Sequence, residues 1–276
     1  MDRKVIDALR IFARILRQDG RRFVLIGASV PQLIFDIREV AIGTGGRETN
    51  DVDAVAEVNS WNDFDRLRER ILQAGFRQGR VAHEFFFGDE VRIDLIPFGQ
   101  ALIEQGRLSW PGGGTIMNSC GLAEALDCAR DEKIADRLTL PVVTIPGLVL
   151  TKIIAYLDRP EERARDLIDI VYCFQRYETK PGASRRFDLA DIQVNDKPLS
   201  YEDAGAYLIG IEIAALAKPN SLAAVRQFVQ RISDKFARPI GQILAEEQRL
   251  VDNDQRRSML YRLFQVFFAG INQSRS

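Results

Sequence analysis

The chain has 276 residues, of which 46% are hydrophobic and 28% charged, and its formal net charge at pH 7 is −1. This length supplies enough core for one large or two ordinary domains, and the near-zero charge gives no global argument for a nucleic-acid binder. No apolar run reaches the roughly 18–20 residues that a membrane span needs. The first residues, Met1-Asp-Arg-Lys-Val-Ile, contain no apolar secretory core. We therefore expect a cytoplasmic protein that makes no use of a membrane.

The cysteine content favours reduced thiols and excludes a zinc site of the usual kind. Cys120, Cys128 and Cys173 are odd in number and widely spaced, with no Cys-x-x-Cys pair among them. The lone histidine and the scattered cysteines lack the spacing of a usual zinc ligand set, so a zinc site is not expected.

The first half of the chain alternates helical and strand patterns. Apolar spacing predicts a helix over 3–18, and the run from Phe23 to Ile26 predicts a buried strand that stops at Gly27. Ser29 is placed to begin a helix that runs to about Arg38, and the Gly-rich stretch 39–50 predicts a loop. The further predicted elements are a strand at 51–58, a helix at 61–74, and paired strands at 80–87 and 91–97 with a Gly88-Asp89 turn.

The second half becomes helical after a short transition. A turn is expected at Trp110 and the glycines that follow it, and a short helix at 121–130. Leu138 to Ile145 predicts an edge strand, because Pro141 cannot donate a ladder hydrogen bond. A loop at 178–200 then interrupts predicted helices at 147–157, 160–176, 201–217, 221–235, 238–251 and 254–269. The prediction is an α/β (α+β) core with a mixed sheet over 1–145 and a mainly α-helical domain over 146–276.

Carboxylates recur on one face of two predicted strands. Asp51 and Asp53 alternate with apolar residues, and Asp94 follows the same alternation on a later strand. Three convergent carboxylates cannot all stay ionised without a cation, and carboxylate oxygens suit Mg²⁺ together with substrate phosphates. The pattern therefore predicts a metal-dependent nucleotidyl-transfer site, with Mg²⁺ or Mn²⁺ held by Asp51, Asp53 and Asp94.

Each of these motifs also has an ordinary structural interpretation. The Gly27-Ala-Ser29 turn can offer free N–H groups and a hydroxyl to a phosphate, but Gly and Ser are common at helix starts for capping alone. The Asp-x-Asp pair equally fits the solvent face of a half-exposed strand. Arg47 and Thr49 just upstream, together with the second Asp-bearing strand, favour the functional interpretation.

The order of the motifs resembles the nucleotidyltransferase superfamily, which has the DNA polymerase β-like fold. The matching motifs are the Gly27-Ala-Ser29 turn, the Arg-x-Thr-x-Asp-x-Asp run over 47–53 and the apolar-Asp-apolar strand at Asp94. Leu150-Thr-Lys152 and the segment from Arg163 to Ile170 resemble one branch, the AbiEii-type nucleotidyltransferases, known as toxins of toxin–antitoxin systems. The resemblance covers roughly residues 20–175.

The resemblance implies a role for each matching residue. The implied nucleotide-binding residues are Gly27, Ser29, Arg47, Thr49 and Lys152. The implied catalytic residues are Asp51, Asp53, Asp94 and Asp166, of which the first three bind the metal. Without the resemblance, Lys152 is interpreted as a snorkelling lysine, and Arg163 with Asp166 as a surface ion pair.

Two departures from the family pattern bear on these assignments. Ala28 stands where a second Gly or a Ser is usual, and Arg165 replaces the usual Lys before Asp166. The charge survives at Arg165, but Arg and Lys are different donors.

The resemblance implies an enzyme that moves a nucleoside monophosphate from an NTP to an acceptor, with the helical domain completing the active-site cleft. Transfer RNA or another RNA is an expected acceptor, and an antitoxin an expected partner. Basic residues of the C-terminal helices, such as Arg226, Arg231 and Lys235, form either an RNA-binding face or an ordinary solvated surface. The alternatives are a small-molecule, antibiotic-type nucleotidyltransferase and a non-catalytic nucleotide-binding relic. His83 and Trp110 are interpreted as structural residues, with base stacking by Trp110 as the alternative.

Overall fold

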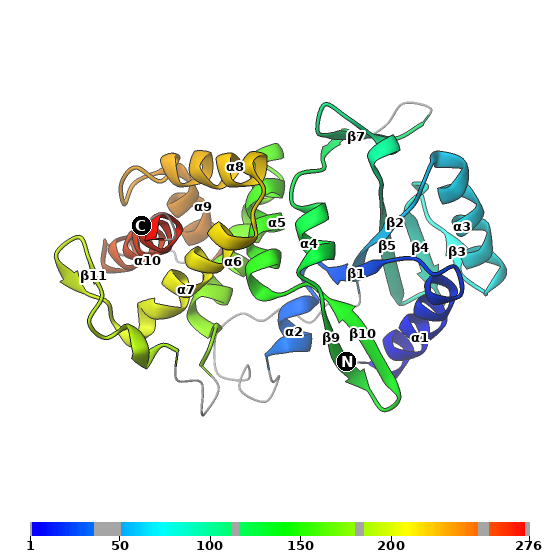
Figure 1. Ribbon diagram of the computed structural model, residues 1–276, viewed down its shortest axis with the longest axis horizontal. Helices are drawn as coiled ribbons and strands as arrows, with labels where there is room; N and C mark the ends of the chain where they lie inside the picture. Colours follow the sequence, from blue (N-terminus) through cyan, green and yellow to red (C-terminus); the bar gives the residue numbers. More distant parts are fainter. Residues whose placement is uncertain (1, 36–50, 112–115, 180–184, 248–253, 274–276) are drawn as a thin grey trace. The chain divides into compact units, whose positions relative to one another are not determined.

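The computed structural model describes residues 2–35, 51–111, 116–179, 185–247 and 254–273. The chain divides into two compact units, Met1–Thr144 and Ile145–Ser276. The first is built around a sheet and the second consists mainly of helices (Figure 1). Within the described ranges, no helix is both long and apolar enough to cross a membrane.

A seven-stranded mixed sheet organises the first unit, in the order β3-β4-β5-β2-β1-β10-β9. The neighbours β2 and β5 run parallel, as do β1 and β10, while the other neighbours are antiparallel. The strands are β1 (Phe23–Ile26), β2 (Asp51–Glu57), β3 (Arg77–Gln78), β4 (Glu84–Phe87), β5 (Val91–Phe98), β9 (Arg130–Ala135) and β10 (Leu138–Val142). The predicted mixed α/β core is confirmed.

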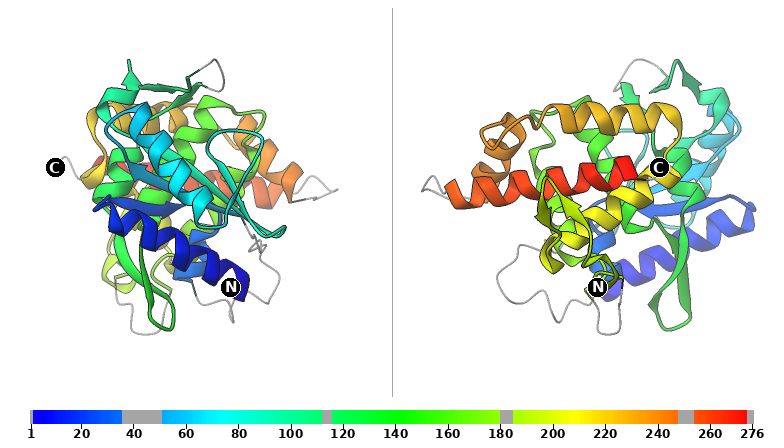
Figure 2. Two further views of the ribbon diagram at one scale, coloured as in Figure 1. Left: turned by 90° about the vertical axis from the view of Figure 1, so that its right-hand side faces the viewer. Right: turned by 60° about the vertical axis from the view of Figure 1, so that its left-hand side comes forward.

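Two helices cover one face of this sheet. α1 (Arg3–Gln18) and α3 (Trp61–Gln73) lie over the same face, both towards the viewer in the left view of Figure 2. α1 buries Phe12, whose ring lies 6.4 Å from that of Phe76; Phe76 in turn lies 5.1 Å from Phe87. Phe87 is the register partner of Val91 on β5, so α1 covers the face that Val91 shares with the alternate residues of that strand.

The structure corrects several predicted boundaries. α2 (Val30–Ile34) ends earlier than predicted, because Phe35 adopts an extended backbone; the loop expected at 39–50 lies outside the described residues. α4 (Leu122–Asp127) is also shorter than predicted. The unit also contains a 3-10 helix (Gln100–Leu102) and a small sheet of β6 (Ile103–Glu104), β7 (Arg107–Ser109) and β8 (Ile116–Asn118).

The predicted edge position of the 138–145 strand is wrong. β10 is an interior strand that pairs with β1 on one side and with β9 on the other. Pro141 lies opposite Asp131 of β9. β9 begins Arg-Asp-Glu-Lys and therefore carries no apolar alternation, so its sequence gave no sign that another strand covers β10.

The second unit confirms the mainly helical prediction. Its helices are α5 (Ile145–Asp158), α6 (Ala164–Arg176), α7 (Tyr201–Leu216), α8 (Pro219–Gln230), α9 (Arg238–Glu246) and α10 (Asp254–Gln273). The region predicted as a loop at 178–200 also contains a short hairpin, β11 (Gln193–Val194) and β12 (Lys197–Pro198). α7 and α10 pack closely at two glycines: a Cβ on Gly210 would lie 2.3 Å from the carbonyl oxygen of Phe267. Gly270 of α10 makes the reciprocal approach to Tyr207.

Candidate active site

Two of the predicted carboxylates stand side by side at the centre of the sheet. β2 and β5 pair in parallel with Asp53 in register with Asp94. Neighbouring strands lie about 4.8 Å apart, so these two side chains emerge from adjacent positions. Val91 faces α1, and Asp94 is three residues further along the strand, so both carboxylates occupy the opposite face of the sheet.

Gly27 lies directly against the side chain of Asp53. The turn follows β1, where Ile26 is in register with Asp53. Gly27 has a left-handed backbone with φ of +81°, and a Cβ built there would lie 1.9 Å from Oδ2 of Asp53. Glycine is thus required both by the backbone and by the approach of the carboxylate. The structure brings together Gly27, Asp53 and Asp94, which the sequence places in three separate motifs.

An arginine that the sequence analysis missed lies among the carboxylates. A guanidinium nitrogen of Arg92 is 2.9 Å from Oδ2 of Asp94 and 3.8 Å from Oδ2 of Asp51. Its Nε lies 3.9 Å from a carboxylate oxygen of Glu84, which is the register partner of Asp94 on β4. Alternation along β5 could have indicated that Arg92 lies beside Asp94, because residues two apart on a strand share a face. Glu84 can be placed at the site only from the β4–β5 register. One guanidinium thus lies within salt-bridge distance of three carboxylates.

Two buried oxygens of predicted site residues in the first unit have no hydrogen-bond partner. Oδ1 of Asp94 and Oγ of Ser29 are both buried and unpartnered within the described residues. Ser29 precedes α2, yet its hydroxyl makes no capping hydrogen bond, so the simple capping interpretation of this serine is wrong. Leaving such atoms unpaired costs about 1–3 kcal/mol each, which is ordinarily offset by a ligand or water.

The electrostatics of Asp94 follow from its burial. Desolvation raises the pKa of Asp94 above its ordinary value, and the Arg92 guanidinium only partly offsets this effect. The carboxyl group is thereby brought closer to a pKa at which it can accept a proton.

The carboxylates of the site have the donor chemistry that a divalent cation prefers, but they do not form a complete ligand set. Asp53 and Asp94 supply hard oxygen ligands from adjacent positions, and Oδ1 of Asp94 is unpartnered. Across the described ranges, no group of three His, Cys, Asp or Glu side chains is arranged to hold a metal ion. Asp51 lies two residues before Asp53, in register with Arg92. A bound cation would therefore need Asp51 to move, or substrate oxygens to complete its coordination.

Two predicted nucleotide-binding residues, Arg47 and Thr49, lie outside the described residues. Their predicted role stays a prediction.

Two further predicted site residues, Lys152 and Asp166, contact each other in the second unit. Nζ of Lys152 on α5 donates to Oδ1 of Asp166 at 2.8 Å and to Oδ2 of Asp169 at 2.6 Å, both on α6. Lys152 is 5% exposed, so the snorkelling interpretation is wrong. Burial alone lowers the pKa of Lys152, but the two aspartates outweigh it and hold the pKa above its ordinary range. Asp169 was missed as a partner, although its spacing from Asp166 places it one turn along the same helix.

These two carboxylates use most of the hydrogen-bond donors of Lys152. An ammonium group has three N–H donors, and two are used by Asp166 and Asp169. One donor is left for a phosphate, so the predicted contact between Lys152 and a nucleotide stays a prediction. Arg163 contributes little here, since its guanidinium lies 3.9 Å from Oδ2 of Asp166 and its side chain is 47% exposed.

His83 and Trp110 belong to one aromatic cluster of the first unit. Their rings are stacked, with centroids 4.5 Å apart. The ring centroid of Trp110 also lies 5.2 Å from that of Trp61 and 5.7 Å from that of Phe64. Burial lowers the pKa of His83, opposed by Asp94 and Glu84. These contacts favour the interpretation of Trp110 as a loop anchor.

We expect Asp94→Asn to stabilise the protein at neutral pH in the presence of EDTA. The raised pKa means that the folded state binds this proton more tightly than the unfolded chain does. The stabilising contribution of Asp94 is therefore present below the ordinary carboxyl pKa and is lost as pH rises through the raised folded-state value. Thermal unfolding of both proteins across pH should show a higher Tm for the variant at neutral pH. The expected increase in the free energy of unfolding is about 1–3 kcal/mol. The difference should vanish below about pH 4. A lower Tm for the variant at neutral pH would show that the pair with Arg92 dominates.

Carboxylates paired on adjacent strands of an α/β unit, over a Gly-x-Ser turn that leaves a buried hydroxyl unpartnered, agree with the nucleotidyltransferase resemblance of the sequence motifs. The sequence profile of the family described as "Nucleotidyl transferase AbiEii toxin, Type IV TA system" matches residues 10–239. The chain belongs to this AbiEii family of nucleotidyltransferases, which confirms the predicted resemblance and enzyme class.

Other comparisons give weaker similarity. No curated protein sequence matches. Among solved structures, a crystal structure assigned to a nucleotidyltransferase of H. pylori is 10% identical, with a TM-score of 0.39 over 99% of this chain and 98% of the other. JHP933 from Helicobacter pylori is 11% identical, with a TM-score of 0.40 over 100% and 96%. The antibiotic-resistance factor ANT(2'')-Ia is 13% identical, with a TM-score of 0.34 over 59% and 77%. The family assignment rests on the profile match.

Proposed function

We propose that this nucleotidyltransferase moves a nucleoside monophosphate from an NTP to a hydroxyl of an RNA, using Mg²⁺ and releasing pyrophosphate, and that an antitoxin counteracts it. The observation that carries the proposal is the register pair of Asp53 and Asp94, with an unpartnered oxygen on Asp94. The toxin family supports the nucleotide substrate and the antitoxin. The cytoplasm, where NTPs and RNA meet, is the compartment that this activity requires.

The chemistry follows from the residues at the sheet face. The acceptor oxygen forms a bond to the α-phosphorus while the bond to the bridging oxygen of the β-phosphate breaks, and the electron pair leaves with pyrophosphate. Ser29 and the N–H groups of the turn at Gly27 would hold the triphosphate, and Oδ1 of Asp94 would accept the hydroxyl proton. Asp51, Asp53 and Asp94 would hold Mg²⁺, which supplies charge neutralisation of the phosphates and activation of the attacking hydroxyl when bound.

The proposal is tested by following the α-phosphate. The protein is incubated with each of the four α-phosphate-labelled NTPs and total cellular RNA, with Mg²⁺, with Mn²⁺ or with EDTA. We expect label on RNA with one or a few of the NTPs, and its loss in EDTA. Label on small molecules of a cell extract but not on RNA would overturn the RNA acceptor and indicate the antibiotic-type activity. Release of no pyrophosphate with any acceptor would overturn transfer itself.

A further inference from the structure

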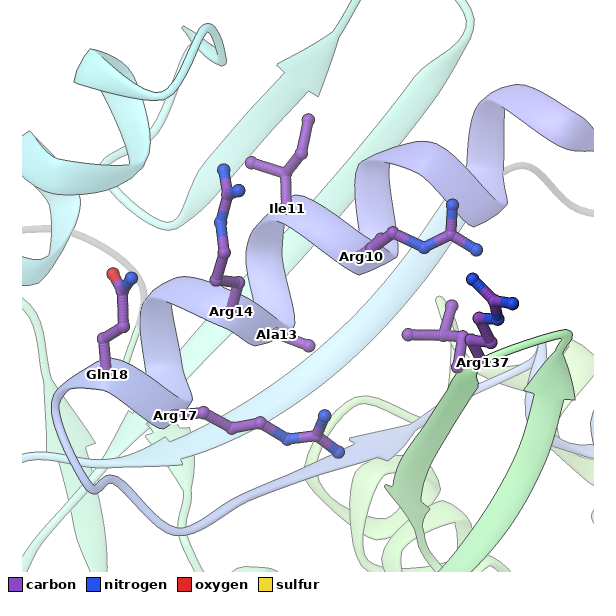
Figure 3. A pocket seen from close by; sticks show the side chains of 8 residues that line it. Arg10, Ile11, Ala13, Arg14, Arg17, Gln18 and Arg137 are labelled. Atoms are coloured by element: carbon purple, nitrogen blue, oxygen red, sulfur yellow. The ribbon is translucent and has the colours of Figure 1, made fainter.

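A basic groove lies in the first unit, between α1 and the β9–β10 hairpin. It encloses about 500 Å³ and is lined by Arg10, Arg14 and Arg17 of α1 and by Arg137 at the tip of the hairpin. Figure 3 shows the side chains of Arg10 and Arg137 pointing towards each other across it. The three α1 arginines follow one stripe of the helix, at spacings of about 6 and 4.5 Å along its axis.

The positive charge in this groove is mostly uncompensated. Within the described ranges, no carboxylate lies in salt-bridge distance of Arg14, Arg17 or Arg137, and Arg10 has only Asp7, at 3.7 Å. Arg10 and Arg17 each donate one hydrogen bond to a carbonyl of the hairpin, of Asp136 and Thr139 respectively. A carbonyl carries no net charge, and a guanidinium has five N–H donors, so charge and donors remain for a ligand.

The acidic groups next to the groove do not neutralise it. Asp136, which precedes Arg137 in the hairpin turn, is paired with Lys133 at 3.2 Å. Arg137 itself has a left-handed backbone with φ of 57°, at a turn position where glycine or asparagine is the ordinary residue.

The chemistry of the groove fits a phosphate backbone better than a protein surface. Guanidinium groups bind phosphate oxygens in pairs of hydrogen bonds, and repeated cations one helical turn apart match a ligand with repeated anions. Protein interfaces depend on exposed apolar anchors. Here Ala13 and Leu138 are 1% and 3% exposed and Ile11 is half-buried, so none of these side chains is an exposed apolar anchor.

We infer that this groove binds the phosphate backbone of RNA and holds the acceptor on the enzyme. The choice of RNA as the ligand rests on the proposed function, whereas the inference that the groove binds phosphate groups does not. The α1-covered face and the carboxylate face are opposite sides of one sheet. The groove would therefore anchor a part of the RNA away from the reacting hydroxyl, and the contact would be independent of sequence.

The basic C-terminal helices are a poorer candidate for this contact. Lys235 pairs with Asp254 at 2.6 Å, and Arg238 pairs with Glu161. These neighbouring carboxylates favour an ordinary solvated surface around Lys235 and Arg238.

The test compares RNA affinity over a series of salt concentrations. Arg14→Gln/Arg137→Gln removes two charges whose side chains form no hydrogen bond or ion pair within the described part of the chain, so the fold is expected to persist. We expect a roughly tenfold weaker Kd for a labelled RNA at low salt, and a salt slope (log K against log salt) reduced by about 1.4. Arg14→Lys/Arg137→Lys, which keeps the charges, should retain most of the slope.

The matched control is Arg66→Gln/Arg68→Gln, the same change in charge on α3 outside the groove. Equal affinities and slopes for the groove variant and this control would overturn the inference, as expected if an acidic protein occupies the groove instead. Asp53→Asn should bind RNA as the wild type does. RNA binding that depends on the groove, in a protein that transfers no label to RNA, would overturn the proposed acceptor and leave the groove assignment standing.

Discussion

Replacing Asp53 with asparagine is expected to lower kcat by at least about a thousandfold, or about 4 kcal/mol of transition-state stabilisation. The amide keeps the size of the side chain but loses the charge with which Asp53, beside its register partner Asp94, would hold a cation. The carboxylate also lies against Gly27, at a place where only a glycine leaves room for it. Release of pyrophosphate from the NTP, measured with saturating Mg²⁺, is the direct readout.

Asp65→Asn is the matched control for this experiment. Asp65 lies on α3, has a side chain that is 52% exposed and pairs with Arg68 at 3.4 Å. The same chemical change there should leave kcat unaltered and the free energy of unfolding within about 0.5 kcal/mol. Turnover by Asp53→Asn at the wild-type rate, with an unchanged fold, would show that the β2–β5 carboxylates are not the catalytic site.

Replacing Lys152 with methionine is expected to lower the free energy of unfolding of the helical unit by about 3–5 kcal/mol. The variant keeps the length of the side chain and leaves Asp166 and Asp169 beside each other without their cation. Both tryptophans of the chain, Trp61 and Trp110, lie in the first unit. Urea unfolding followed by far-UV circular dichroism should therefore show an earlier helical transition, while tryptophan fluorescence keeps its midpoint.

A neutralised triple variant separates charge from packing. Lys152→Met with Asp166→Asn and Asp169→Asn removes the buried charges together and should recover most of the lost stability. An unchanged helical transition in Lys152→Met would contradict the buried pair. A triple variant as unstable as the single one would attribute the loss to packing of the lysine stem.

Local signals in the sequence determined the elements around the site and the class of protein. The apolar spacing over 3–18 defines α1, the run from Phe23 to Ile26 defines β1, and both have the predicted bounds. Period-two alternation correctly placed Asp53 and Asp94 on one side of their strands, because that property depends only on the backbone of each strand. The order of the motifs was sufficient to identify the AbiEii family.

The tertiary structure decided which of these residues meet. Asp53 and Asp94 are 41 positions apart, and only the parallel register of β2 and β5 makes them neighbours. The same sheet order brings Glu84 and Arg92 to the site, and the packing of α6 on α5 gives Lys152 both of its aspartates. β9 is too charged to be predicted as a strand, yet its hairpin with β10 carries Arg137 to the arginine stripe of α1. Contacts of this kind depend on pairing between distant segments, for which a single sequence carries no local signal.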